Sequence, residues 1–459
     1  MPDPDHPDTR GAAPAPGTLT RDLLAAAKAA GAEAADAMAV AGTSLSIDVC
    51  QGALERAERA ERTDIGLRVL IGRRQVVVSA SDVSARTVEE LAERAVAMAR
   101  AAPEDPYAGL ACPDILAREW DLAALELNDA APEPAPAALQ DTARATEAAA
   151  LRVPGVSQVQ SASAGHARTQ VHIAASNGFS GGYTRTESAL SCTAIAGEGA
   201  EMERDHDGDS RIFAADLRAP EEIGRRAGAR AVARLGARRP PAGAWPVVYD
   251  ERVAASLIGH LLSAMNGAAV ARGASWLLGR EGAQVLPVAL SLAEDPLRPR
   301  GPASRPFDAE GLPTRRRDLV AHGTLNGWLL DLASARKLGR APTGHARRSP
   351  GGMPAPASSN VMLTEGARDR AGLLAEMGTG LLVTSLIGAT INPTTGDYSR
   401  GAAGFWVEGG EIAYPVNECT IAGHLPAMLR SLVPANDARP HLARAVPSLL
   451  VEGLTLAGA

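Results

Sequence analysis

The amino-acid sequence predicts an α+β protein built from three units along the chain. Its 459 residues exceed what one ordinary hydrophobic core holds, so two or three domains are expected. In the first half, stretches with helical spacing of apolar residues alternate with short β-type runs. The second half is rich in glycine and strand-like runs. We therefore expect an N-terminal α/β-layer domain, a central α+β domain, and a mainly β C-terminal domain with a few helices.

The N-terminal domain is expected at 18–102, after a disordered, proline-rich tail at 1–17. Thr20 is a plausible N-cap for its first helix, and Gly31 a natural stop. A hairpin turn is expected at Gly72. Strands are predicted at 45–50, 63–71 and 74–81. The second helix is predicted at 87–102, where Thr87 and Glu90 have the spacing of a capping box.

A proline-rich stretch at 103–136 predicts a linker that wraps over a surface. The central domain follows at 137–237, with a hairpin expected about Gly165. Its other elements are predicted as a helix, a strand and a closing helix, at 137–151, 180–199 and 220–237. The C-terminal domain, at 238–459, is expected to open with a strand at 245–250 and a helix at 251–265. Further strand signals occur at 316–333, 359–364, 380–387, 403–415 and 447–456.

Composition excludes several classes of function. A net charge of −7 over this length is mild, and the short arginine runs lack the interleaved aromatic residues on which nucleic-acid binders stack bases. No uncharged apolar run reaches the length of a membrane span, and the N-terminus is unlike a signal peptide. The four cysteines form no CxxC pair, which argues against structural zinc and a disulfide framework. We expect a cytoplasmic protein that binds neither nucleic acid nor membrane.

One acidic stretch has the spacing of a calcium loop. Positions 1, 3, 5 and 12 of such a loop would be Asp205, Asp207, Asp209 and Asp216. The position that needs glycine holds Ser210, and the bidentate glutamate is missing. A solvated acidic loop at 205–210 is therefore the favoured interpretation.

The nine histidines include no pair that could bind a metal from one face of a helix, because no histidine has a second histidine at i+3, i+4 or i+5. His260 is one of them, within the apolar helical stretch "AASLIGHLLSAM" at 254–265. By itself, His260 reads as a partly buried, hydrogen-bonded histidine. A metal ligand is the less favoured alternative.

Several long strings resemble one known family. They are "SNGFSGGYTRTESALSCTAIAGEG" at 176–199, "FDAEGLPTRRRDLVAHGTLNGWLLDLASARKLG" at 307–339 and "NPTTGDYSRGAAGFWVEGGEIAYPVNECTIAG" at 392–423. They are similar to the PmbA, or TldE, branch of the TldD/PmbA family. Two N-terminal strings fit as well, so the resemblance runs from about residue 18 to the end.

The resemblance implies a subunit of a two-component metallopeptidase of the prokaryotic cytoplasm. TldD-type subunits of the family carry HExxxH on a helix, with a cysteine near the C-terminus completing a zinc site. PmbA-type subunits lack the motif and pair with TldD in a heterodimer. The assembly removes leader peptides from modified peptides and degrades unfolded ones. Extended peptides would enter an internal chamber and pair with strand edges.

The family's zinc helix, carried over residue by residue, falls on 255–260. Only Gly259 and His260 match, while Ala255 and Ser256 replace the first ligand and the water-activating glutamate. No cysteine follows Cys419, so the third ligand is missing as well. We expect no catalytic or metal-binding residue and no cofactor in this chain, and zinc in the TldD-type partner.

The remaining candidates for substrate or interface contacts, besides His260, are Asn392, Asp397 and Arg400. Asn392 begins a tight turn in which Gly396 takes the strained position, and Arg400 is expected to hold that turn through Asp397. The stretch 343–356 is expected to be a flexible, basic loop that gates an opening or touches a partner.

Two function hypotheses remain open. The leading one is a non-catalytic PmbA-type subunit that completes a peptide chamber with a zinc-bearing TldD-type partner. The alternative is a stand-alone peptide-binding or scaffolding homodimer without peptidase activity, since nothing in the residues demands a partner.

Overall fold

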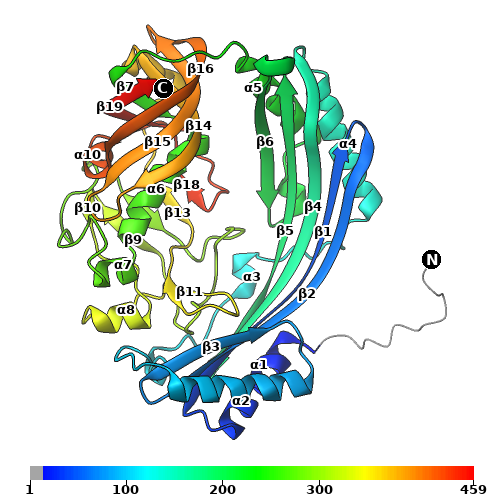
Figure 1. Ribbon diagram of the computed structural model, residues 1–459, viewed down its shortest axis with the longest axis vertical. Coiled ribbons are helices and arrows are strands. Elements are labelled where there is room, and N and C mark those ends of the chain that lie inside the picture. Colours follow the sequence, from blue (N-terminus) through cyan, green and yellow to red (C-terminus); the bar gives the residue numbers. More distant parts are fainter. Residues whose placement is uncertain (1–13, 459) are drawn as a thin grey trace.

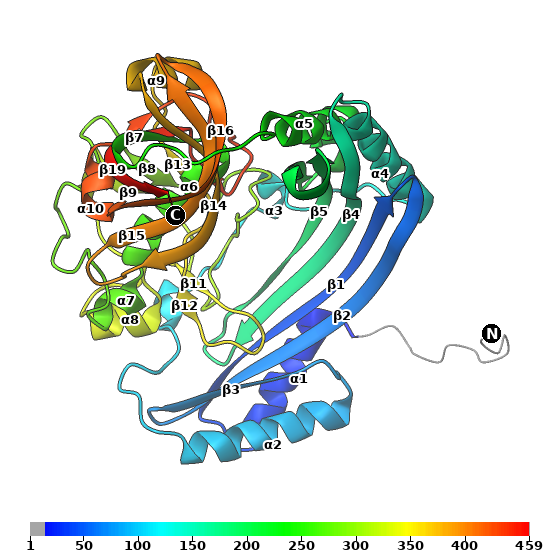
Figure 2. The ribbon, with the colours of Figure 1, turned by 45° about the horizontal axis from the view of Figure 1, so that its top comes forward.

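The computed structural model describes residues 14–458 as a long curved sheet that faces a C-terminal body of smaller sheets and helices (Figures 1 and 2). The predicted α+β class is confirmed. Most of the tail expected at 1–17 lies outside the described residues, and helix α1 already begins at Pro16. Among the described residues, no helix is long and apolar enough to cross a membrane.

The long sheet has six strands in the order β3-β2-β1-β4-β5-β6, with antiparallel neighbours. Their bounds are β1 (Ala34–Cys50), β2 (Ala53–Ile71), β3 (Arg74–Ala80), β4 (Val156–Ala175), β5 (Ser180–Ala196) and β6 (Glu203–Arg211). The hairpin at Gly72 is confirmed, since Ile71 pairs with Arg74. The strands at 45–50 and 63–71 are much longer than predicted. Pairing with β1 supplies backbone hydrogen bonds to the charged, exposed half of β2, which has no apolar pattern of its own.

The predicted hairpin about Gly165 is wrong, because β4 runs through it without a turn. Gly165 pairs with Ser46 on one side and Ala189 on the other. A Cβ atom at this position would come 3.3 Å from the carbonyl oxygen of Leu45. Glycine here permits close approach of a neighbouring backbone, which is the alternative meaning of glycine inside a strand.

Two pairs of helices cover one face of this sheet, here called the outer face. They are α1 (Pro16–Ala29) with α2 (Ala85–Ala101), and α4 (Pro136–Leu151) with α5 (Pro220–Ala233). The predicted N-caps of the first pair are wrong. Pro16 begins α1, so Thr20 lies inside it and bonds His172, while Ser84 caps α2 by accepting from the Thr87 N–H.

Pairing of β1 with β4 joins the two predicted N-terminal units into one sheet, with fourteen residue pairs from Asp36–Ala175 to Val49–Ala162. Between them, the linker predicted at 103–136 crosses the surface and contains the short helix α3 (Leu122–Leu125). Arg336 donates to the carbonyl oxygens of Tyr107, Gly109 and Leu110 and so fixes part of this segment. The exact domain boundaries stay a prediction.

The C-terminal body contains two more sheets and a two-stranded pair. The first sheet has the order β16-β15-β14-β7-β19-β17, and an extra pairing of β16 with β19 closes five of these strands into a ring. Its strands are β7 (Gly243–Tyr249), β14 (Gly380–Ile391), β15 (Asp397–Glu408), β16 (Glu411–His424), β17 (Val433–Pro434) and β19 (Leu449–Gly458). The second sheet and the pair consist of β8 (Leu292–Glu294), β9 (Arg317–Ala321), β10 (Thr324–Leu325), β13 (Val361–Leu363), β18 (Arg444–Ala445), β11 (Ala346–Arg347) and β12 (Ala355–Pro356). The helices are α6 (Glu251–Ala264), α7 (Gly267–Ala271), α8 (Leu332–Lys337), α9 (Arg370–Met377) and α10 (Leu425–Arg430).

This body packs on the inner face of the long sheet, opposite the helix pairs. Phe307 lies at the centre of the contact, with ring centroids 4.9 Å from Trp120 and 5.0 Å from Phe179. The stretch 343–356, expected to be flexible, takes part in this contact. Arg348 forms an ion pair with Asp36 of β1, and both side chains are buried. A paired, buried arginine anchors the stretch at Arg348, while its role as a gate or a partner contact stays a prediction.

Two buried carboxyl groups lie beside this contact. Asp308 accepts hydrogen bonds from the N–H groups of Glu310, Leu312 and Ala346, whereas Glu310 accepts one, from Leu332. Burial, and then the charge of Asp308, raise the pKa of Glu310 to about 8. Glu310 therefore holds a proton in the folded protein at neutral pH.

Glu310→Gln should make the protein less sensitive to alkaline pH. The folded protein keeps this proton up to about pH 8, whereas unfolded chains lose it at the usual glutamate pKa, so stability falls as pH rises between the two values. Relative to the variant, the wild type should lose about 2 kcal/mol of unfolding free energy from pH 6 to 8. Urea unfolding at several pH values measures this difference.

Glu452→Gln serves as the matched control, since Glu452 is exposed on β19. Its unfolding free energy should follow that of the wild type at every pH. Parallel curves for the wild type and Glu310→Gln would contradict the assignment of the proton.

Candidate functional site

Helix α6 carries the residues singled out by the sequence and follows β7 directly. Asp250 caps it by accepting from the Arg252 N–H at 3.2 Å. Leu257, Ile258 and Leu261 are fully buried in the largest core, against the ring of strands. This packing explains the apolar face of the helix and places His260 near its last turn.

The donor set on α6 does not fit a catalytic zinc ion. Ala255 has no ligand atom, and the Ser256 hydroxyl donates to the carbonyl oxygen of Val253 at 2.7 Å. His260 is then a single imidazole, whereas catalytic zinc needs about three protein ligands. No cluster of three His, Cys, Asp or Glu side chains suited to a metal occurs within residues 14–458. The expectation that this chain carries no cofactor stays a prediction.

His260 lies between an aromatic ring and two arginines. Its ring meets that of Tyr398 edge-on, with centroids 5.9 Å apart, and its Nε2 atom is buried without a hydrogen-bond partner. Burial, followed by the charges of Arg400 and Arg444, lowers the pKa of His260 below its usual value. The sequence interpretation as a hydrogen-bonded histidine is therefore wrong for Nε2.

The turn at 392–397 joins β14 to β15 and holds itself together. The Asn392 side chain accepts from the N–H groups of Thr394 and Thr395, and Gly396 takes the left-handed conformation, as expected (φ 84°). Asp397 accepts from the Thr395 hydroxyl at 2.6 Å. The expected link from Arg400 to Asp397 is wrong, because the Arg400 Nε donates to the carbonyl oxygen of Gly388 at 2.7 Å.

Strand β14 has a free edge near Arg400. Strand β7 pairs with β14 only from Leu381 to Val383. Beyond this point, 385–387 and 390–391 pair with β15 on one side, with a bulge at 388–389, and among the described residues they pair with no strand on the other. Asn392, Asp397 and Arg400 thus gather at the far end of this edge, and His260 lies near Arg400. An unpaired edge of this kind can accept an extended peptide.

The acidic stretch at 205–210 lies elsewhere and is neither a calcium loop nor a solvated loop. It forms β6, whose alternation turns Asp205, Asp207 and Asp209 to the same, buried face. Side chains spaced along an extended strand do not converge on one ion. Asp207 instead accepts from Arg218 and Arg230, each at 2.8 Å.

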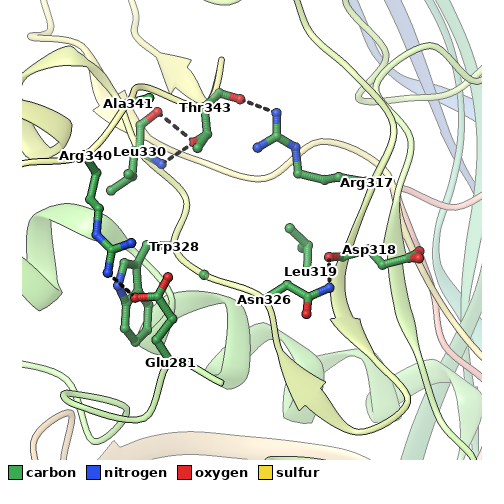
Figure 3. A pocket seen from close by; sticks show the side chains of 11 residues that line it. Glu281, Arg317, Asp318, Leu319, Asn326, Trp328, Leu330, Arg340, Ala341 and Thr343 are labelled. Atoms are coloured by element: carbon green, nitrogen blue, oxygen red, sulfur yellow. Dashed lines mark hydrogen bonds and ion pairs between the residues drawn. The ribbon is translucent and has the colours of Figure 1, made fainter. Parts of the chain in front are cut away.

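A further pocket, of about 220 Å³, lies on the C-terminal body beside β9 and β10 (Figure 3). Several of its polar groups already pair with one another or with the backbone. Arg340 donates to Glu281, Arg317 to the carbonyl oxygen of Thr343, and Asn326 to that of Asp318. The sequence singled out none of these as a site.

Three family models cover most of the chain, described as domain 1, the central domain and the C-terminal domain of the PmbA/TldA metallopeptidases. They match residues 35–99, 128–235 and 242–458. The chain belongs to the PmbA/TldD family. Metalloprotease PmbA of Escherichia coli O157:H7 is 36% identical over 95% of this chain and 94% of that protein. The Metalloprotease PmbA homolog of Haemophilus influenzae is 34% identical over 90% of both.

Solved structures agree with this assignment. A protein of Bacteroides thetaiotaomicron, provisionally described as a modulator of DNA gyrase, has a TM-score of 0.89 at 27% identity over 96% of this chain and 98% of that one. TldE of Thermococcus kodakarensis shares the fold, with a TM-score of 0.84 at 20% identity over 96% of this chain and all of that one. The PmbA branch predicted from the sequence is confirmed by its relatives.

Sequence reasoning missed Tyr398 and Arg444 as neighbours of His260. Tyr398 lies inside the string that carried the resemblance, two residues before Arg400, and alternation alone places both on one face of a strand. Arg444 had no such signal, because only tertiary packing brings it to α6.

Asp207→Asn should destabilise the protein, since it leaves the surrounding arginines without their counter-ion. Burial raises the pKa of Asp207, but Arg218, Arg230 and Arg226 outweigh it and lower the pKa below its usual value. We expect a loss of about 2–4 kcal/mol in unfolding free energy at pH 7. This contribution should fade as the pH falls through the lowered pKa.

Asp216→Asn is the control, because its partner Arg300 is far more exposed and such pairs contribute about 1 kcal/mol or less. Added calcium should leave the melting temperature of the wild type unchanged. A calcium-induced rise that Asp207→Asn abolishes would restore the calcium interpretation.

Proposed function

We propose that this chain is a PmbA-type subunit that forms a peptide chamber with a zinc-bearing TldD-type partner in the cytoplasm. The assembly would remove leader peptides from modified peptides and degrade unfolded ones, with zinc and the catalytic glutamate supplied by the partner. In this heterodimer, the chain described here contributes a binding surface for an extended peptide.

The donor set of α6 carries the proposal. A family of metallopeptidases is built around a histidine pair and a glutamate on this helix, and here Ala255 and Ser256 stand in two of those places. Neither side chain can ligate zinc or activate water. The helix packs in the core through Leu257, Ile258 and Leu261, which supports a role for it as part of the framework of a binding surface.

Two surfaces suit a peptide chamber. One is the free edge of β14 at 385–391, which offers unpaired backbone groups to an extended chain. The other is the part of the inner face of the long sheet that the C-terminal body leaves uncovered, where Ser44, Ser46 and Ser191 are exposed (Figure 2). Short polar side chains leave room for a second chain or a substrate.

Peptidase activity should require both subunits. The purified chain alone should not cleave a fluorogenic unstructured peptide, and adding a TldD-type protein from the same source should produce cleavage that a chelator abolishes. His260→Ala should leave the zinc content and the chelator sensitivity of the assembly unchanged, because the imidazole would ligate no metal. Glutamate→glutamine in the partner's HExxxH should reduce activity by at least about a thousandfold.

Two outcomes would count against the proposal. Chelator-sensitive cleavage by the chain alone would place a catalytic metal in it. A homodimer that ignores the TldD-type protein in analytical ultracentrifugation would favour the peptide-binding or scaffolding homodimer.

A further inference from the structure

Two arginines beside α6 differ from most of the charged groups around them. Arg252 pairs with Asp250 and Asp205, and Arg439 pairs with Glu251. Arg400 and Arg444 have no carboxylate partner among the described residues. Guanidinium groups without a carboxylate partner keep donors free for an anion, which makes this pair a candidate binding site.

Arg444 packs on α6, and Arg400 lies on β15 two residues after Tyr398, whose ring contacts His260. Arg444 lies over Gly259, where a Cβ atom would come 3.0 Å from its Nη1. Arg400 uses only Nε, in its bond to Gly388, so its two terminal nitrogens keep their donors. Both guanidinium charges act on His260, whose buried Nε2 has no partner. The His260 ring thus lies near two cationic side chains. Arg444 is exposed and Arg400 is half-buried.

We propose that Arg400 and Arg444, with His260 beneath them, form a binding site for a peptide carboxylate. Guanidinium groups bind carboxylates through paired, charge-assisted hydrogen bonds, and two of them can hold both oxygens. The same two charges repel a metal cation, so the helix that holds zinc in catalytic relatives is adapted here to an anion.

The adjoining strand edge indicates that the carboxylate belongs to an extended peptide. This step rests on the proposed function. Gly388, which accepts from Arg400, lies in the bulge of β14 between Ile387 and Thr390, so a chain paired along the free edge from 385 onward would run toward the arginines. Ile387 is 69% exposed beside it and offers an apolar contact to a neighbouring peptide residue. The favoured source of the carboxylate is the peptide C-terminus.

Binding of short peptides to the purified full chain tests the site without any partner or zinc. The probes are acetyl-tetraalanine with a free carboxylate, the same peptide as its carboxamide, and a carboxamide with one internal glutamate. Calorimetry should show at least about tenfold tighter binding of the free carboxylate than of the plain carboxamide. In ¹³C-histidine-labelled protein, the His260 resonances should shift only with the carboxylate-bearing probes.

Arg444→Gln and Arg400→Gln should each weaken carboxylate binding about tenfold or more, and both should leave carboxamide binding unchanged. Arg444 has an exposed side chain, and its backbone pairing with Val361 does not depend on the side chain, so its variant should melt like the wild type. Arg430→Gln is the matched control, since Arg430 is an exposed arginine whose Nε donates to the carbonyl oxygen of Pro426. It should bind like the wild type.

Equal affinity for carboxylate and carboxamide, or undiminished binding by Arg444→Gln, would overturn the proposal. Comparable binding of the glutamate probe would support a carboxylate site that also takes acidic side chains, whereas discrimination against it would support the C-terminus. If the chain binds carboxylates but does not pair with a TldD-type protein, the carboxylate site stands and the heterodimer is refuted. If the heterodimer is active but the chain shows no preference for carboxylates, the heterodimer stands and the carboxylate site is refuted.

Discussion

The antiparallel pairing of β1 with β4 is the contact on which the rest of the structure depends. It connects strands that are more than a hundred residues apart and turns two helix-strand layers into one six-stranded sheet. Both helix pairs then cover the same face, because each pair buries the apolar side of its own strands. The opposite face is left for the C-terminal body.

Charge distinguishes the interfaces of this protein from its candidate site. Where the C-terminal body meets the long sheet, acidic groups are matched with arginines: Asp36 with Arg348, and Asp205 with Arg252. Matched, buried pairs fix the relative position of the two parts, since separation would leave charges without partners in a poorly hydrated contact. Around His260 this matching is absent, and the unmatched groups are all cationic or neutral.

The chain belongs to a family of metallopeptidases, yet helix α6 offers no set of metal ligands among the described residues. The core packing of α6 is independent of zinc, because its buried leucines and isoleucine face the ring of strands. What the helix positions now is His260, between Tyr398 and two arginines, at the end of a free strand edge.

Local patterns in the sequence predicted much of this protein. The α+β class, the turn at Gly72, the helix at 137–151, and the strand and helix that open the C-terminal domain followed from residue types and spacing, because caps, turns and periodicity are local properties. The family followed from the resemblance of long strings to known members. His260, Asn392, Asp397 and Arg400 were singled out in the same way, and the structure brings them to one end of β14. Tertiary structure decided the rest: the long strands, the continuous β4 at Gly165, the burial of Asp205, Asp207 and Asp209, and the approach of Arg444 to α6. The physical reason is the same for each. Partners distant in the sequence supply the hydrogen bonds and counter-charges, and no local pattern records where those partners will lie.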